Sequence, residues 1–154
     1  MTVIFVTGMS GAGKSTALAE LARRGHRAVD TDHGGWIVEV DGEPLWRTDR
    51  IDALLGGHER SGEPLFLSGT VANQALFYPR FAEVVLLSAP LAVMLARVAA
   101  RAGNPFGKAA GERARIVADT AEVEPLLRAS ATAEIDTRLP LGDVVDRLVA
   151  LSGR

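Results

Sequence analysis

Residues 8–16 read GMSGAGKST, and this stretch decides the fold. It contains three glycines and is followed by a strong helix-forming run, ALAELARRG at residues 17–25. The run before it, TVIFVT at residues 2–7, is apolar and rich in β-branched residues, as expected of a strand. Glycine adopts backbone conformations that other residues avoid, so the glycines predict a tight loop between a strand and a helix.

The spacing within this loop indicates a chemistry. Its residues fit the pattern G-x-x-x-x-G-K-[ST], the Walker A motif, whose backbone N–H groups form an anion-binding concavity in front of a helix N-terminus. The pattern predicts that Lys14 reaches the β- and γ-phosphates of ATP and that the Ser15 hydroxyl binds Mg²⁺. The alternative is a glycine-rich turn without a ligand. The nucleotide-binding residues predicted here are Gly8, Gly11, Ala12, Gly13, Lys14, Ser15 and Thr16.

The composition predicts one domain over residues 1–154. The chain has 47% hydrophobic residues, enough for a core, and a net charge of −2, which gives no positive footprint for nucleic acid. It has no cysteine, which excludes disulfides and cysteine metal sites. The start, MTVIFVTG, does not resemble a signal peptide, and no apolar run is long enough to span a membrane. We therefore expect a cytoplasmic monomer without a membrane or nucleic-acid partner.

Short apolar runs alternate with helical patterns, which predicts an α/β fold with a parallel sheet covered on both faces. Strands are predicted at Val3–Thr7, Arg27–Asp30, Leu65–Ser68, Glu83–Ser88 and Ala133–Asp136. Helices are predicted at Lys14–Arg24, Arg50–Glu59, Val71–Leu76, Leu91–Arg101, Glu112–Arg128 and Gly142–Leu151. Two stretches, Asp32–Thr48 and Gly103–Gly111, match neither pattern. Both fall where such a fold holds its chemistry, in the loops that follow its regular elements.

Two carboxylates close the second predicted strand in the sequence VDTD, residues 29–32. We expect Asp30 to hold Mg²⁺, directly or through water, and Asp32 to accept the proton of an attacking hydroxyl or to orient it. The alternative is that Asp32 caps a helix at HGGWI and Asp30 is a turn residue. The third strand carries no carboxylate at its end, where Ser68 and Thr70 either face the substrate or form a tight turn.

A basic loop follows the fourth predicted helix. Lysine occurs only at positions 14 and 108, and the sequence RVAARAGNPFGK at residues 97–108 ends on the second of them. We expect a lid over residues 103–111 that closes on the phosphates and brings Arg101 and Lys108 to the transferring group. One alternative is a solvated helix end whose arginines complement the helix dipole, and another is a loop pinned by Phe106.

Other residues carry weaker signals. Arg138 and Pro140, in the sequence EIDTRLPLGDVV at residues 134–145, could border a flat ring. The aromatic residues of the unassigned stretches, Trp36, Trp46 and Phe106, are more often core than pocket residues. The histidines, at positions 26, 33 and 58, have no metal-ligand spacing.

Taken together, these motifs resemble the small P-loop kinases of the nucleoside monophosphate kinase-like group, the shikimate kinase family in particular. The resemblance implies a five-stranded parallel sheet of order 2-3-1-4-5 in a three-layer P-loop fold. It implies that Asp30 helps to hold Mg²⁺, that Asp32 contacts the substrate, and that Arg101 lies over adenine while Lys108 reaches the phosphates. The sequence IDTRLP is similar to the family's adenine-binding loop, so Pro140 would pack on the other face of the base.

The sequence also departs from that family. The sequence SGT follows the third strand instead of a glycine triplet, and VEPLL places Val123 and Glu124 where the family has an arginine that grips the substrate carboxylate. The family's second such arginine has no clear counterpart, although Arg47 or Arg50 could substitute in space. We therefore expect an ATP- and Mg²⁺-dependent kinase whose small hydroxylated acceptor is not shikimate. The alternative is a nucleotide-dependent switch without an acceptor.

The segment expected to bind the acceptor covers residues 32–62. It contains Arg47, Arg50 and Arg60 but is also rich in acidic residues, which favours a sugar, nucleoside, alcohol or antibiotic over a nucleoside monophosphate. The alternative is that these charges form a solvated helix face.

Overall fold

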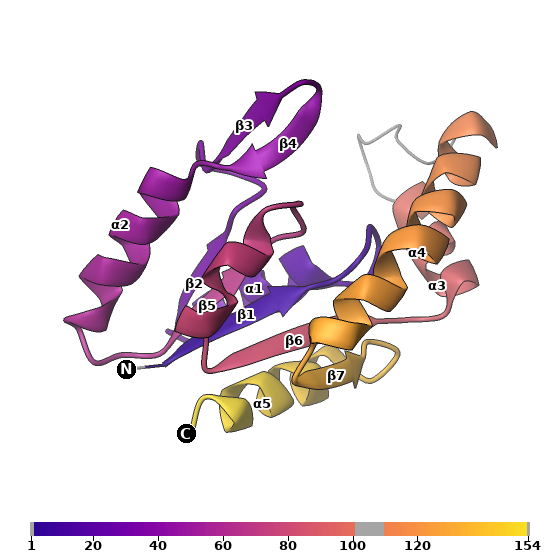
Figure 1. Cartoon of the computed structure of the whole chain (residues 1–154). Helices are drawn as coiled ribbons and strands as arrows, with labels where there is room; N and C mark the ends of the chain where they lie inside the picture. The colour runs from indigo at the N-terminus through magenta and orange to yellow at the C-terminus, as the bar shows by residue number, and fades with distance from the viewer. Residues whose placement is uncertain (1, 101–109, 154) are drawn as a thin grey trace.

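The computed structural model describes residues 2–100 and 110–153 (Figure 1). The strands are β1 (Val3–Thr7), β2 (Arg27–Asp30), β3 (Ile37–Val40), β4 (Glu43–Trp46), β5 (Leu65–Ser68), β6 (Glu83–Ser88) and β7 (Ala133–Asp136). The helices are α1 (Lys14–Arg23), α2 (Thr48–Glu59), the 3₁₀ helix η1 (Gln74–Arg80), α3 (Leu91–Ala100), α4 (Ala110–Ser130) and α5 (Leu141–Leu151).

The central sheet has five parallel strands in the order β2-β5-β1-β6-β7. Counted along the predicted strands, this is the order 2-3-1-4-5, and the predicted bounds of all five strands are confirmed. β1 lies in the middle, with Ile4 opposite Phe66 of β5 and Glu83 of β6. The phosphate loop therefore leaves the sheet at its centre, between the ends of two neighbouring strands.

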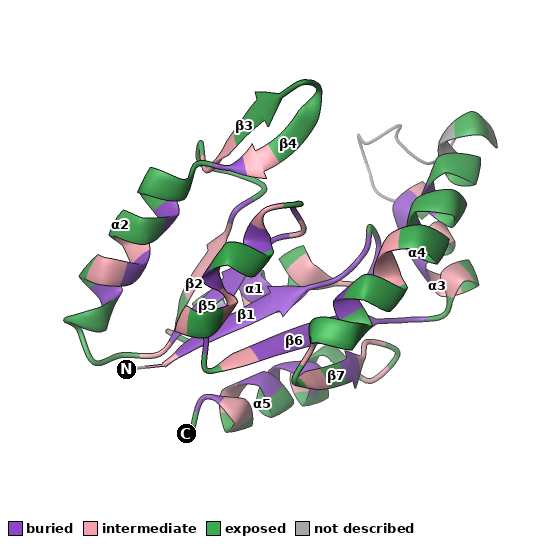
Figure 2. Cartoon of the chain, in the orientation of Figure 1, coloured by how far each residue is buried: buried purple, intermediate pink, exposed green. Residues whose placement is uncertain are grey.

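Both faces of the sheet are covered, because side chains of β1 alternate between two cores. Ile4 and Val6 belong to a cluster that includes residues of α1 and α5, and Val3 and Phe5 belong to a cluster that includes residues of α2 and η1. Figure 2 shows the buried strands between helices whose outer surfaces are exposed. The result is the expected three-layer arrangement.

The stretch left unassigned after the second strand contains a β-hairpin. β3 and β4 pair antiparallel around Asp41 and Gly42, which both have positive φ, 54° and 79°. An Asp-Gly pair at these positions is typical of a two-residue hairpin turn, so the sequence VEVDGEPLW held a signal for it. The helix that Asp32 would have capped at HGGWI is absent from this described stretch, because the chain passes through a loop into β3.

Several helix bounds differ from prediction. α2 begins at Thr48, two residues before the predicted start, and α4 extends from Ala110 to Ser130. The helix predicted at residues 71–76 is instead the 3₁₀ helix η1, shifted toward the C-terminus and containing Pro79. Gly111 lies within α4, so the end of the expected lid segment is helical. Among the helices of residues 2–100 and 110–153, none has the length and hydropathy to cross a bilayer.

Candidate functional site

The phosphate loop lies at the carboxyl end of β1, and its shape depends on glycine. A Cβ atom on Gly8 would lie 2.5 Å from the carbonyl oxygen of Leu87. Gly11 has a φ of +83°, and a Cβ there would lie 2.5 Å from the carbonyl oxygen of Met94. These two positions exclude any side chain, because backbone atoms of β6 and α3 pass too close. The glycine spacing of the motif thus has a steric cause.

The residues predicted to bind phosphate and metal meet in one place. The Lys14 ammonium donates to the carbonyl oxygens of Gly8, at 2.6 Å, and Met9, at 3.4 Å. The Ser15 hydroxyl donates to Oδ2 of Asp30 at 2.8 Å. The start of α1 and the end of β2 are therefore joined by the two residues predicted to hold Mg²⁺. A hydroxyl and a carboxylate are oxygen ligands, which Mg²⁺ prefers, so the pair fits this ion.

The loop that carries Asp32 is fixed by buried neighbours. Asp30 Oδ1 accepts from the N–H of Asp32 at 3.1 Å, which makes Asp30 a turn residue as well as the partner of Ser15. Between them, Thr31 is buried and its hydroxyl donates to the carbonyl of Ser68 at 2.6 Å. The Trp46 indole N–H donates to the same hydroxyl at 2.9 Å. Asp32 itself is exposed, on a turn that buried residues hold in place.

The two hydroxyl residues at the end of β5 have different surroundings. Ser68 is fully buried, and its Oγ has no hydrogen-bond partner among the described residues, so of the two alternatives its burial disfavours the one in which its hydroxyl faces a substrate. Thr70 donates to the carbonyl of Gly8 at 2.6 Å and lies 3.2 Å from the Thr7 hydroxyl. Thr70 therefore ties the end of β5 to the start of the phosphate loop.

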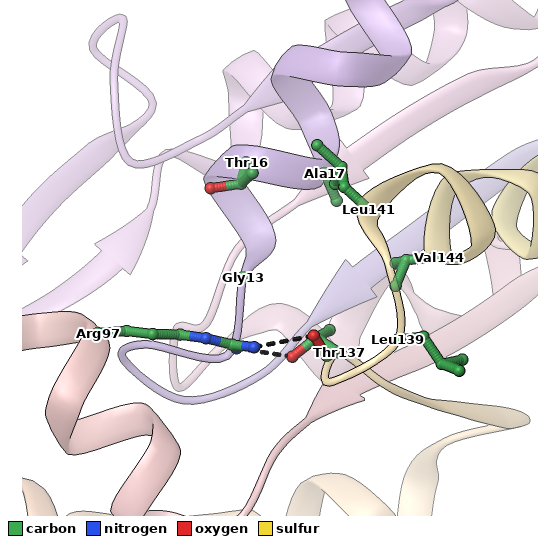
Figure 3. A pocket seen from close by; sticks show the side chains of 8 residues that line it. All are labelled: Gly13, Thr16, Ala17, Arg97, Thr137, Leu139, Leu141 and Val144. Carbon is green, nitrogen blue, oxygen red and sulfur yellow. Dashed lines mark hydrogen bonds between the residues drawn. The ribbon is translucent and has the colours of Figure 1, made fainter.

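A cavity of about 220 Å³ opens beside the phosphate loop (Figure 3). Its lining residues come from α1, α3, α5 and the loop after β7, and they are Gly13, Thr16, Ala17, Arg97, Thr137, Leu139, Leu141 and Val144. Mostly apolar walls with a few polar groups are typical of a site for a flat organic ring. Its position next to Gly13 and Thr16 suits the base of a nucleotide whose phosphates lie on the loop.

The residues predicted to border the base lie near this cavity. Pro140 is the N-cap residue of α5, between two lining residues, Leu139 and Leu141. Arg138 donates to Asp136 through Nη2 at 2.6 Å, and this ion pair raises the pKa of Arg138 and lowers the pKa of Asp136. Arg138 lines a different cavity, beside α4. Its predicted contact with the base stays a prediction.

Arg97 is a site residue that the sequence analysis did not single out. It lies on α3 and lines the cavity beside Gly13 and Thr16, and its guanidinium donates to Gly11 and Thr137. The only available signal was its place at the start of the basic stretch RVAARAGNPFGK, four residues before Arg101. Arg101, Lys108, Phe106 and the glycines at 103 and 107 lie outside the described residues, so the lid stays a prediction.

Val123 and Glu124 stand where the shikimate kinase family is expected to have an arginine that binds the substrate carboxylate, and both lie on α4. Val123 packs against the core cluster that contains α1 and α5, and Glu124 pairs with Arg128 at 3.3 Å. Arg47 and Arg50 lie at the start of α2, where Arg50 donates to the carbonyl of Gly35 at 2.9 Å in the loop after Asp32. Within residues 2–100 and 110–153, no group of three or more histidine or acidic side chains forms a metal cluster.

Known proteins are similar to this chain in sequence and in fold. The AAA domain family model matches residues 4–118. The shikimate kinase of Halorhodospira halophila is 32% identical over 151 residues, which cover 87% of this chain and 83% of that protein. The solved shikimate kinase from Acinetobacter baumannii in complex with shikimate has a TM-score of 0.65 at 24% identity, over 98% of this chain and 92% of that one. A gluconokinase from Sinorhizobium meliloti has a TM-score of 0.56 at 24% identity, over 99% and 92%.

Proposed function

The chain belongs to the AAA domain family and is a shikimate kinase-like P-loop kinase, and from that premise we propose that it transfers the γ-phosphoryl group of ATP to the hydroxyl of a small molecule other than shikimate. It is an ATP-dependent small-molecule kinase by family. The observation that carries the proposal is the hydrogen bond between Ser15 and Asp30, 2.8 Å long, which joins the carboxylate of Asp30 to the first turn of α1 after the phosphate loop.

The phosphate loop binds the nucleotide through backbone and charge. Gly13 is the N-cap of α1 and has no side chain with which to cap the first N–H groups of the helix, so these are available to phosphate oxygens. Lys14 lies over the loop, where its ammonium adds positive charge to the same site. Ser15 and Asp30 would hold Mg²⁺, directly or through water, and a bound ion would neutralise charge on the phosphates.

Asp32 prepares the acceptor. It lies two residues beyond Asp30, exposed, on a turn held by Thr31 and Trp46. A carboxylate in this place accepts the proton of the attacking hydroxyl or fixes its direction toward the phosphate. Arg101 and Lys108 of the proposed lid stabilise the charge that develops during transfer. We place the acceptor at this turn, against the rest of the segment of residues 32–62 to which the turn belongs.

The charges of that segment favour an uncharged acceptor. The hairpin exposes Glu39, Asp41 and Glu43, and a carboxylate or phosphate ester would be repelled by them. Two other acids, Asp52 and Glu59, pair with Arg80 of η1. Val123 and Glu124 supply no positive charge at the place where shikimate kinases are expected to have one. A neutral sugar, nucleoside, alcohol or antibiotic therefore suits the segment best.

A panel of hydroxylated compounds tests the proposal. Release of ADP is measured with neutral sugars, nucleosides, aminocyclitol antibiotics, shikimate, gluconate and nucleoside monophosphates, for the native protein and for Asp32→Asn. A neutral compound should raise turnover well above basal hydrolysis, and Asp32→Asn should remove that increase. Turnover with shikimate, or tight binding of a nucleoside monophosphate, would overturn the acceptor class.

One alternative has an observation in its favour. The end of β5 carries no carboxylate, and the side chain of Ser68 there is fully buried. A switch that binds ATP and hydrolyses it slowly needs no acceptor. If no compound in a broad panel raises turnover above basal hydrolysis, the switch replaces the kinase.

A further inference from the structure

Arg97 connects three segments that are far apart in the sequence. Its Nη1 donates to the carbonyl oxygen of Gly11 at 3.1 Å and to the Thr137 hydroxyl at 2.8 Å. Its Nη2 donates to the Thr137 carbonyl oxygen at 2.8 Å. Figure 3 shows the guanidinium directed at Thr137, with Gly13 beside it. One side chain of α3 thus joins the phosphate loop to the loop after β7.

Thr137 completes the connection. Its hydroxyl donates to the carbonyl of Ala12 at 2.7 Å, and its N–H donates to the carbonyl of Ser88 at the end of β6 at 2.8 Å. Thr137 also packs on the loop, because a Cβ built on Gly13 would lie 3.5 Å from its Cγ2. The phosphate loop is therefore held to the rigid end of the central sheet through this threonine.

Arg97 forms no ion pair with a described carboxylate. The oxygen atoms that accept from it are two carbonyls and one hydroxyl. Asp136 is bound by Arg138, which is the main cause of its lowered pKa, and the positive charge of Arg97 adds a smaller part of that lowering. A half-buried guanidinium whose hydrogen-bond acceptors are all uncharged, beside a phosphate loop, favours an anion in that loop.

We propose that Arg97 and Thr137 form a clamp that positions the phosphate loop for nucleotide binding, with Arg97 acting as a positioning residue. In a trans peptide the N–H points opposite to the carbonyl of the preceding residue. Fixing the Ala12 carbonyl toward Thr137 therefore turns the N–H of Gly13 to the other side, where the loop binds phosphate. This inference rests on the proposed ATP site and adds a residue pair that sets its geometry.

Matched variants separate the clamp from ordinary packing. Thr137→Val keeps the shape but removes the hydroxyl, and Thr137→Ser restores the hydroxyl. Arg97→Lys keeps the charge but loses the planar fork that serves two loops at once. Arg147→Gln, which removes an exposed arginine of α5, is the control. Affinity for Mg-ATP, and separately for tripolyphosphate and adenosine, is measured by calorimetry, and thermal unfolding without ligand checks the fold.

If the clamp is correct, Thr137→Val and Arg97→Lys should each lower the affinity for Mg-ATP and for tripolyphosphate about tenfold, an effect of the size expected for a hydrogen bond to a charged group. Adenosine should be affected less, kcat should change less than KM for ATP, and Thr137→Ser should behave like the native protein. If both variants bind tripolyphosphate as the native protein does, the clamp is overturned. If the native protein itself does not bind Mg-ATP, the proposed function fails and the clamp fails with it.

Discussion

The two sides of the site are built in opposite ways. On the nucleotide side, the residues from Val3 to Ala12 are buried with the exception of Ser10, and the loop is tied to β5, α3 and β7 by Thr70, Arg97 and Thr137. On the proposed acceptor side, every residue from Asp32 to Leu45 is exposed or half-buried. The nucleotide side is a rigid backbone site, while the acceptor side presents side chains on a hairpin and a loop.

This difference explains what each side can specify. A backbone cradle recognises phosphates whatever else they are attached to, and steric constraints fix its sequence. An exposed hairpin can change its side chains at little cost in stability, so the acceptor can differ between proteins with one fold. The solved shikimate kinase and gluconokinase share the fold of this chain. The following tests act on one side at a time.

The largest effect is expected from Lys14→Ala, on the nucleotide side. The Lys14 ammonium donates to the carbonyl of Gly8 and so supplies positive charge at the phosphate loop. Loss of this charge should abolish turnover and stabilisation by Mg-ATP. Native protein at a ligand concentration of 100 Kd should gain about 2.7 kcal/mol of unfolding free energy. Thermal unfolding with and without Mg-ATP measures this gain in stability.

The control is Arg23→Ala, which removes an exposed cation of the same helix and should keep the stabilisation by Mg-ATP seen in the native protein. Equal stabilisation of Lys14→Ala and native protein would refute the nucleotide site.

On the acceptor side, Asp32→Asn should lower kcat roughly 10²- to 10⁴-fold, the usual size of a general-base contribution. Affinity for Mg-ATP should stay unchanged, because the phosphate loop is untouched. Asp41→Asn is the matched control: it removes an exposed carboxylate from the hairpin turn, and asparagine tolerates the positive φ there. Steady-state kinetics with the acceptor found in the panel give the answer. A rise in the Kd of Mg-ATP equal to the loss in kcat would mean that the two sides are not separate.

A glycine pair tests whether the rigidity of the nucleotide side is steric. Gly11→Ala combines a positive φ with a collision against the Met94 carbonyl, whereas Gly25→Ala has a φ of +90° and open space around the new Cβ. Gly25→Ala should lose roughly 1 to 2 kcal/mol of stability from the left-handed backbone, and Gly11→Ala should lose more because of the collision. Only Gly11→Ala should also weaken Mg-ATP binding, by at least about tenfold, because the loop must move. Calorimetric titration of both variants decides, and a native affinity for Gly11→Ala would show that the loop tolerates a side chain.

The sequence was most informative where the determinants are local. Each central strand is a short apolar run. A parallel sheet buries both of its faces, so the strands could be located without an alternation of apolar and polar residues. The phosphate loop was equally clear, because the collisions that demand Gly8 and Gly11 fall at a fixed spacing. The hairpin was missed although its Asp-Gly turn was in the sequence, since proline and exposed acids obscured the alternation of β4.

The rest depended on contacts between distant residues. Arg97 and Thr137 are 40 positions apart, and nothing in the helix around Arg97 distinguishes it from an arginine on a solvated surface. Trp46 was expected to be a core residue and is buried, but its hydrogen bond to Thr31, which fixes the turn of Asp32, follows only from the packing. The sequence left open whether Ser68 faces the substrate, and only the packing shows that its side chain is buried.

The smallest effect concerns pH and lies away from both sides, at the far end of α2. His58 is fully buried with no described partner for Nε2, and its pKa is lowered, first by burial and then by the positive charge of Arg27, while Glu63 opposes the change. Unfolding restores a pKa of about 6.5, so the unfolded chain binds more protons below that pH. The free energy of unfolding should therefore be fully retained above about pH 6.5 and decline as the pH falls from there.

Urea unfolding at pH 7.5 and 5.5 should show a smaller decline for His58→Gln than for the native protein. His33→Gln, on the exposed loop after Asp32, should leave the native decline unchanged. An undiminished decline in His58→Gln would assign the acid sensitivity to other groups and leave His58 as packing alone.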